Sequence, residues 1–207
     1  MPSPQDQPSP DQPLKFASRG GFKLHHALAE FGIDPRGAVC ADLGCSVGGF
    51  TDCWLQHGAD KVYAVDTAYG ELAWTLRNDE RVRVMERTNA LHAEPIERVR
   101  FVSLDLSWTR QTLAIPAALR WLTDDAAQPG TIISLIKPHY ECTKDELRAH
   151  ATKGVLPEAF AREVAERVAA SLPELGVHVV GLTQSPITGS SKRAKGNHEW
   201  LVACERA

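Results

Sequence analysis

Two lysines and two carboxylates in this sequence have the residue types needed for acid–base chemistry. Lys137 directly follows the apolar run "TIISLI" at residues 131–136. Asp105 closes another apolar run, Glu199 begins a third, and Lys23 lies in the stretch "SRGGFKL". Because a lysine is seldom buried without a partner, its place at the end of a core strand indicates a specific role. An amine held beside carboxylates can donate or accept a proton, which makes acid–base chemistry the prediction to examine.

A glycine-rich turn, "DLGCSVGGF" at residues 42–50, connects a predicted strand to a predicted helix. Glycines let the backbone approach a ligand there, and the start of the helix offers free N–H groups. A carboxylate that ends the next strand can accept hydrogen bonds from ribose hydroxyls. The pattern predicts a site for a nucleoside-containing cofactor, with a plain tight turn as the alternative. The candidate binding residues are Asp42, Gly44, Ser46, Gly48, Gly49, Phe50 and Asp66.

The glycine spacing separates two cofactor classes. The dinucleotide-binding fingerprint is G-x-G-x-x-G, and the positions of Gly44, Gly48 and Gly49 do not match it. Asp42, just before the first glycine, suits a cationic amino group such as that of S-adenosylmethionine. The turn therefore favours S-adenosylmethionine over NAD.

The elements that must position these residues alternate between strand and helix. The first predicted helix carries Leu24, Leu28 and Phe31 on one face and ends at Gly32. Further helices are predicted at 48–58, through Leu119 and Leu122, after a capping box of Thr143 and Glu146, and from Pro157. This alternation predicts an α/β, Rossmann-like fold with a mostly parallel sheet. The predicted strands are 38–44, 61–66, 82–87, 99–105, 131–137, 176–183 and 198–205.

The predicted topology brings the four candidate catalytic residues to one edge of the sheet. Ligands bind outside the carboxyl ends of parallel strands, where Asp105 and Lys137 lie on probable neighbours. The last two strands are joined without a helix, so the last strand is predicted to be antiparallel and its start, with Glu199, reaches the same edge. The helix before the first strand runs opposite to it, which places Lys23 there too. Each residue alone has a plain explanation as a solvated or capping charge, so the prediction depends on their convergence.

Composition bounds the class of protein. The chain has 207 residues and a net charge of −3, so contact with nucleic acid would require a local basic patch. Five cysteines without a C-x-x-C pair indicate neither a disulfide framework nor a zinc site, and suit a reducing, cytoplasmic compartment. The sequence contains no apolar run of membrane-spanning length. Residues 1–14, with five prolines, are predicted to be a disordered tail, and 15–207 a single domain.

The motifs resemble those of the FtsJ-like (RrmJ-type) ribose 2′-O-methyltransferases, most closely the TlyA, or haemolysin A, branch. The stretches that carry the resemblance are "SRGGFKL", residues 42–74, "ERTNA", "LIKPHYE" and "SPITG…GNHEWL", which together span 18–202. The family's Lys–Asp–Lys–Glu tetrad falls on Lys23, Asp105, Lys137 and Glu199. The resemblance implies a seven-stranded class I fold, S-adenosylmethionine as cofactor, and methyl transfer to a ribose 2′-hydroxyl, usually in ribosomal RNA or a ribosomal subunit. It also implies that Asn89 lies near the adenine and that Asp105 borders the cofactor.

Three departures from the branch leave the substrate open. The N-terminal S4 RNA-binding domain typical of the branch is expected to be missing, "DLSWT" stands where the branch has a "DVSF" type of motif, and the loop with "SSKRAK" is longer. A basic rim for RNA is predicted from Arg19, Lys192, Arg193 and Lys195. The alternatives are a methyltransferase for another RNA or a small molecule, a non-catalytic RNA-binding or ribosome-assembly factor, and a pore-forming haemolysin, which no membrane-spanning run supports.

Overall fold

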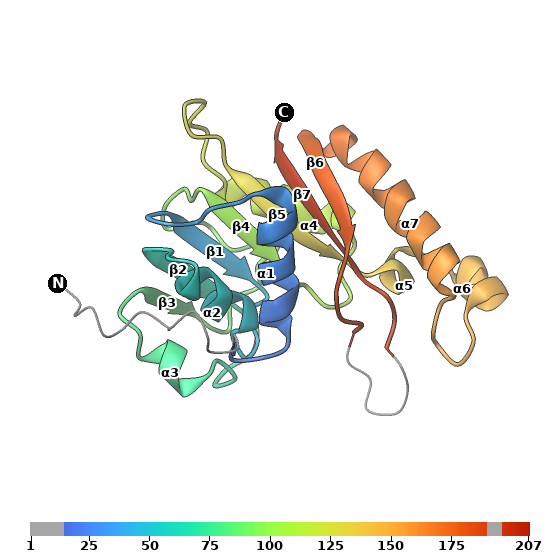
Figure 1. Cartoon of the computed structure of the whole chain (residues 1–207), viewed down its shortest axis with the longest axis horizontal. Coiled ribbons are helices and arrows are strands. Elements are labelled where there is room, and N and C mark those ends of the chain that lie inside the picture. The colour runs from blue at the N-terminus through green and yellow to red at the C-terminus, as the bar shows by residue number, and fades with distance from the viewer. Residues whose placement is uncertain (1–14, 190–195) are drawn as a thin grey trace.

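A single seven-stranded sheet forms the centre of the computed structural model, which describes residues 15–189 and 196–207. The strands lie in the order β3-β2-β1-β4-β5-β7-β6 (Figure 1). The predicted tail, residues 1–14, lies outside the described residues. The strands are β1 (Val39–Leu43), β2 (Lys61–Val65), β3 (Val82–Met85), β4 (Phe101–Leu104), β5 (Thr131–Ile136), β6 (Val177–Gln184) and β7 (Trp200–Arg206).

Strand direction confirms the predicted mixed sheet. β1 pairs in parallel with β2 and β4, β2 with β3, and β4 with β5. β7 is antiparallel to both of its neighbours, β5 and β6. Because the pairing of β5 with β7 ends at Ile136 opposite Trp200, the next residues along, Lys137 and Glu199, meet at the same edge of the sheet.

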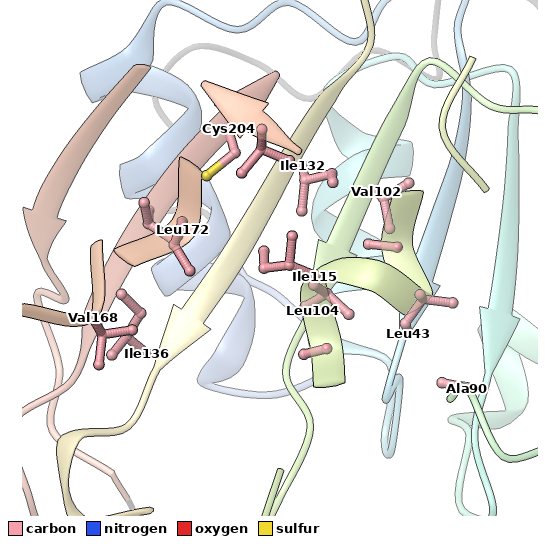
Figure 2. Close-up of a cluster of buried hydrophobic side chains, with 14 of the residues drawn as sticks. Leu43, Ala90, Val102, Leu104, Ile115, Ile132, Ile136, Val168, Leu172 and Cys204 are labelled. Carbon is pink, nitrogen blue, oxygen red and sulfur yellow. The ribbon is translucent and has the colours of Figure 1, made fainter. Parts of the chain in front are cut away.

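Helices cover both faces of the sheet, which explains why β5 is mostly apolar and has every residue buried. One apolar cluster packs β-strand residues against α4, α7 and the 3-10 helix that follows α7, as Ile115, Val168 and Leu172 show in Figure 2. The other cluster packs the opposite face against α1 and α2, which lie in front of the sheet in Figure 1. The helices are α1 (Gly20–Phe31), α2 (Gly49–Gln56), α3 (Trp74–Arg77), α4 (Gln111–Trp121), α5 (Pro138–Glu141), α6 (Lys144–His150) and α7 (Glu158–Ser171), followed by the 3-10 helix η1 (Leu172–Leu175).

The local signals for helix ends are confirmed where side chains or glycine supply the missing bonds. Thr143 and Glu146 form both hydrogen bonds of a capping box at the start of α6. Gly32 ends α1 in the left-handed conformation, at φ 65°. The predicted strand 82–87 was too long, since β3 ends at Met85 and Arg87 turns the chain at φ 52°. The four-residue helices α3 and α5 were not predicted, because one helical turn leaves no periodic apolar pattern.

Candidate active site

The four predicted catalytic residues form two ion pairs at one edge of the sheet. Lys137 Nζ lies 2.5 Å from Asp105 Oδ1, and Lys23 Nζ lies 2.5 Å from Glu199 Oε2. The Lys23–Glu199 pair is almost fully buried, with side chains 10% and 4% exposed, whereas the Lys137–Asp105 pair is 12% and 25% exposed. Each lysine is thus held by a carboxylate from a different segment, and the Lys137 pair is the more open to a ligand.

Regular elements hold each member of these pairs. Lys137 is the last residue before α5, whose first residue is Pro138, so the strand cannot continue past the lysine. Asp105 follows β4 directly, and its N–H donates to the Leu43 carbonyl at 3.1 Å. Lys23 lies in the first turn of α1, the end of the helix that meets the sheet edge. Backbone geometry therefore positions these charges before any ligand binds.

Both ion pairs face one cavity of about 660 Å³, a volume typical of small-molecule sites. The predicted residues Gly44, Ser46, Gly49 and Phe50 of the glycine-rich turn line it as well. Arg19, predicted as an RNA-binding residue, also lies on its wall. The other three residues of the predicted basic rim, Lys192, Arg193 and Lys195, lie outside the described residues. We call this space the transfer cavity.

A second cavity, of about 490 Å³, lies beside the transfer cavity and contains the predicted residues Asp66 and Asn89. Gly44, Ser46 and Asp105 line both spaces, so the two cavities adjoin at the glycine-rich turn. Asp66 accepts hydrogen bonds from the backbone N–H groups of Ser46 and Ala68, each at 2.8 Å, and thereby ties the turn to the end of β2. We call this space the cofactor cavity.

Glycine is required at position 44 for two reasons. Its φ is 95°, and a Cβ there would lie 2.6 Å from the Asp105 carbonyl oxygen. The turn therefore passes directly against the end of β4, which opens the junction between the two cavities. This close approach explains why the first position of the glycine-rich turn needs a residue without a side chain.

Two of the predicted cofactor-binding residues line neither cavity. Asp42 has no exposed surface, and its carboxylate accepts hydrogen bonds from the Thr51 and Ser103 hydroxyls at 2.7 and 3.0 Å. Burial raises its pKa to about 7, while these two bonds act in the opposite direction. Gly48 faces Leu76 in the interior. Both residues shape the turn from beneath, and the predicted direct contact of Asp42 with a cationic amino group does not fit this buried position.

Aromatic residues that the sequence prediction missed surround the open side of the cavities. His139 and Tyr140, directly after Pro138, line the transfer cavity, and Trp108 lines the cofactor cavity. The Tyr140 ring lies 5.0 Å from that of Trp108 and 3.9 Å from that of His139, and Trp108 is 83% exposed. Burial, followed by the charge of Lys137, lowers the pKa of His139, which favours the neutral ring at neutral pH. Adjacency to Lys137 in "KPHY" was the signal that could have identified His139 and Tyr140.

Other chemistries receive no support from the described parts of the chain. The cysteine on the transfer-cavity wall, Cys45, is buried, and burial raises its pKa, which disfavours the nucleophilic thiolate. No group of histidine, cysteine, aspartate or glutamate side chains suited to a metal ion occurs in residues 15–189 and 196–207. Over the same residues, no helix is both long and apolar enough to cross a bilayer.

Comparison with known proteins finds relatives that are named as rRNA methyltransferases. The 16S/23S rRNA (cytidine-2′-O)-methyltransferase TlyA of Mycobacterium tuberculosis is 41% identical over 197 residues, which cover 93% of this chain and 69% of TlyA. YqxC of Bacillus subtilis, named as an rRNA methyltransferase, is 39% identical over 92% of this chain and 66% of its own length. The chain thus spans about two thirds of the length of these relatives.

The chain is also similar to solved structures and to a protein family as a whole. A structure from Streptococcus thermophilus, named as a hemolysin candidate, superposes with a TM-score of 0.83 at 37% identity, covering 95% of this chain and 69% of that one. The FtsJ-like methyltransferases match residues 16–206, a range that contains both cavities and all four members of the two ion pairs. The chain belongs to the FtsJ-like methyltransferase family.

Proposed function

We propose that this protein transfers a methyl group from S-adenosylmethionine to a ribose 2′-hydroxyl of ribosomal RNA in the cytoplasm. The observation that carries the proposal is the pair of ion pairs, Lys137–Asp105 and Lys23–Glu199, in a cavity that adjoins a second one suited to a nucleoside. The name of the TlyA relative supports this reaction and makes cytidine the nucleotide to test first.

The residues of the cofactor cavity fit the cofactor that this family uses. Gly44 leaves the space that a side chain would fill, and Asp66 stands at the end of β2, where a carboxylate can accept bonds from ribose hydroxyls. Asn89 lies across the same cavity and is proposed to face the adenine. When bound, S-adenosylmethionine supplies a methyl group on a sulfonium that carries its own leaving group.

The chain's own residues act on the accepting hydroxyl. Asp105 holds the Lys137 amine at the junction of the two cavities, and Glu199 holds Lys23 on the wall of the transfer cavity. As the oxygen of the hydroxyl gains the methyl group, its proton must leave. Lys137 either accepts this proton as an amine, or polarises the O–H bond as an ammonium while the proton passes to water. Alignment by the remaining charges supplies the rest of the rate enhancement.

The surroundings of the transfer cavity suit a nucleic acid more than a small molecule. The Trp108–Tyr140 pair presents exposed aromatic surface on which a base can stack, a contact that single-stranded nucleic acids commonly make. Arg19 adds a positive charge on the wall of the same cavity. These features extend the site beyond the space that a free nucleoside would occupy.

A transfer assay with defined RNA acceptors tests the proposal. Purified protein is incubated with S-adenosylmethionine labelled in its methyl group and with 16S RNA, 23S RNA or intact subunits, and modified riboses are mapped by resistance to alkaline cleavage. We expect label at a small number of cytidine 2′-oxygens. Cofactor binding without label in any RNA would contradict the proposal, and label in a small nucleoside alone would indicate a small-molecule methyltransferase.

A further inference from the structure

A two-residue turn between α6 and α7 (Figure 1) carries a lysine into the wall of the transfer cavity. Thr152 and Val155 exchange two backbone hydrogen bonds, at 2.9 and 3.0 Å, across the turn. Lys153 and Gly154 form its tip, with φ values of 51° and 81°. Positive φ at both central residues is the pattern of a type I′ turn, which favours asparagine, aspartate and glycine. A lysine is therefore an unexpected residue at the first tip position.

Left-handed backbone at Lys153 is unfavourable for a residue with a side chain, because its Cβ comes too close to the following carbonyl oxygen. Four non-glycine residues in the described parts of the chain have positive φ, and three of them, Ser46, Trp108 and Lys153, line the two cavities. Unfavourable backbone of this kind concentrates at functional sites, where the surrounding structure holds it in place. The unfavourable backbone conformation of Lys153 therefore indicates a role in the functional site and is not explained by the requirements of the turn.

Hydrogen bonds from Asn197 fix the position of the turn that carries Lys153. Its side-chain N–H donates to the Gly154 carbonyl at 3.0 Å, and its side-chain oxygen accepts from the Leu156 N–H at 2.9 Å. Its backbone carbonyl accepts from the Gly189 N–H at 2.9 Å. Because Asn197 precedes Glu199 by two residues, the Lys153 turn is fixed relative to the buried ion pairs.

Lys153 differs from the other two lysines of the cavity in having no counter-charge. Lys23 and Lys137 are each paired with a carboxylate. Lys153 and Arg19 are exposed and make no ion pair within residues 15–189 and 196–207. An unpaired cation on the wall of a cavity whose own charges are balanced offers its full charge to an anionic ligand.

We infer that Lys153 binds a backbone phosphate of the RNA strand beside the nucleotide whose ribose enters the transfer cavity, and that Asn197 is the positioning residue for this contact. The inference rests on the proposed function for the identity of the substrate. Its chemistry is general, since a lysine recognises phosphate as a point charge. Lys153 fixes the register of the strand and carries no sequence information, as phosphate contacts do in general.

Binding of a fluorescein-labelled oligocytidylate, followed by anisotropy over a range of salt concentrations, tests the contact. Lys153→Ala is expected to weaken binding by about three- to tenfold at low salt and to reduce the slope of log affinity against log salt by about 0.7. Lys144→Ala is the matched control, because Lys144 is an exposed lysine at the start of α6 that does not line the cavity. It is expected to leave affinity and slope as in wild type.

A double-mutant cycle tests the role of Asn197. Asn197→Ala is expected to reduce oligocytidylate affinity in wild type and to have little further effect in the Lys153→Ala background, because both changes remove the same contact. A merely structural role would give additive losses and would overturn the positioning assignment. Thermal melting and S-adenosylmethionine affinity identify variants that have lost the fold.

The outcomes separate this inference from the proposed function. If wild type methylates ribosomal RNA and Lys153→Ala keeps the wild-type salt slope, the inference is wrong and the function stands. If wild type methylates no RNA but Lys153→Ala still flattens the slope, the function is wrong and the phosphate contact stands. If wild type binds no oligocytidylate and methylates no RNA, both are overturned.

Discussion

The two adjoining cavities are built in different ways. The cofactor cavity is formed mainly by segments that directly follow β1, β2, β3 and β4, with backbone groups and short turns as its walls. The transfer cavity shares the glycine-rich turn and the end of β4 with the cofactor cavity, and its other walls come from α1, the segment after β5, the loop before β7 and the turn between α6 and α7. One therefore depends on consecutive strand ends of a parallel sheet, and the other on contacts between distant segments.

This difference predicts that the two cavities can be damaged separately. Gly44, Ser46 and Asp105 line both cavities, whereas Lys23, Lys137 and Glu199 line the transfer cavity alone. Substitutions at Lys23, Lys137 or Glu199 should remove methyl transfer and spare cofactor affinity. Substitutions at Asp66 should weaken cofactor binding, and the transfer rate should return when the cofactor is saturating.

The largest effect is expected at Lys137. Lys137→Ala should lower the rate of methyl transfer by about 10²- to 10⁴-fold, the usual contribution of a positioned acid–base group. Cofactor affinity, measured by titration calorimetry, should change little, because Lys137 does not line the cofactor cavity. Lys137→Arg separates the two roles: arginine keeps its protons, so substantial activity would identify polarisation and its absence would identify a base. Near-wild-type transfer by Lys137→Ala would remove the functional distinction between the cavities.

Glu199 should have the next largest effect, on stability. Glu199→Leu leaves Lys23 buried without its partner, which should lower the free energy of unfolding by about 3 kcal/mol in urea titrations. The double variant Lys23→Met, Glu199→Leu should recover most of that loss, because no unpaired charge remains, and should still fail to transfer methyl groups. A double variant that is no more stable than Glu199→Leu would contradict this account of the buried pair.

Asp66 provides the reverse test on the cofactor side. Asp66→Asn should weaken S-adenosylmethionine binding by about tenfold, equivalent to one charged hydrogen bond of about 1.4 kcal/mol. Asp60→Asn is the control, since Asp60 is an exposed aspartate just before β2 and lies outside both cavities. At saturating cofactor, the transfer rate of Asp66→Asn should return to near the wild-type rate. An unchanged S-adenosylmethionine affinity would contradict the assignment of Asp66 to cofactor binding.

A separate effect, on the pH dependence of stability, is expected at Asp42. Its pKa is about 7 in the folded protein and 3.8 ordinarily, so between these values the folded state binds more protons than the unfolded state. This group therefore makes the free energy of unfolding fall as pH rises from about 4 to 7, by up to about 1.4 kcal/mol per pH unit. Asp42→Asn should flatten that part of the pH profile in urea titrations at pH 5 and pH 8. An equal pH profile in wild type and variant would mean that the buried carboxyl does not titrate in this range.

Sequence patterns were sufficient where the physical cause is local. The capping box of α6, the left-handed glycine after α1 and the mostly apolar strand β5 are each signalled by residues within a short stretch of the sequence. The pairing of Lys137 with Asp105 could also be predicted, because neighbouring parallel strands present their carboxyl ends together.

Asp42 and Lys153 show where such patterns fail. Asp42 looks like a ligand from its place beside the first glycine, but packing of α2 and β4 buries it against Thr51 and Ser103. Lys153 looks like an ordinary loop lysine, and the bonds from Asn197 hold its turn at the cavity. In both cases at least one contact, from Ser103 to Asp42 or from Asn197 to the Lys153 turn, comes from a segment far away in the chain.

The sequence by itself determined the fold class, the glycine-rich turn and the four charged residues, because strand and helix periodicity and strand order are encoded in short stretches and simple topology. The tertiary structure alone decided how deeply each ion pair is buried, which cavity-lining cations have no carboxylate partner, and which residues of the turn line a cavity. These properties depend on side-chain burial and on distances between remote segments, which only the packed chain defines.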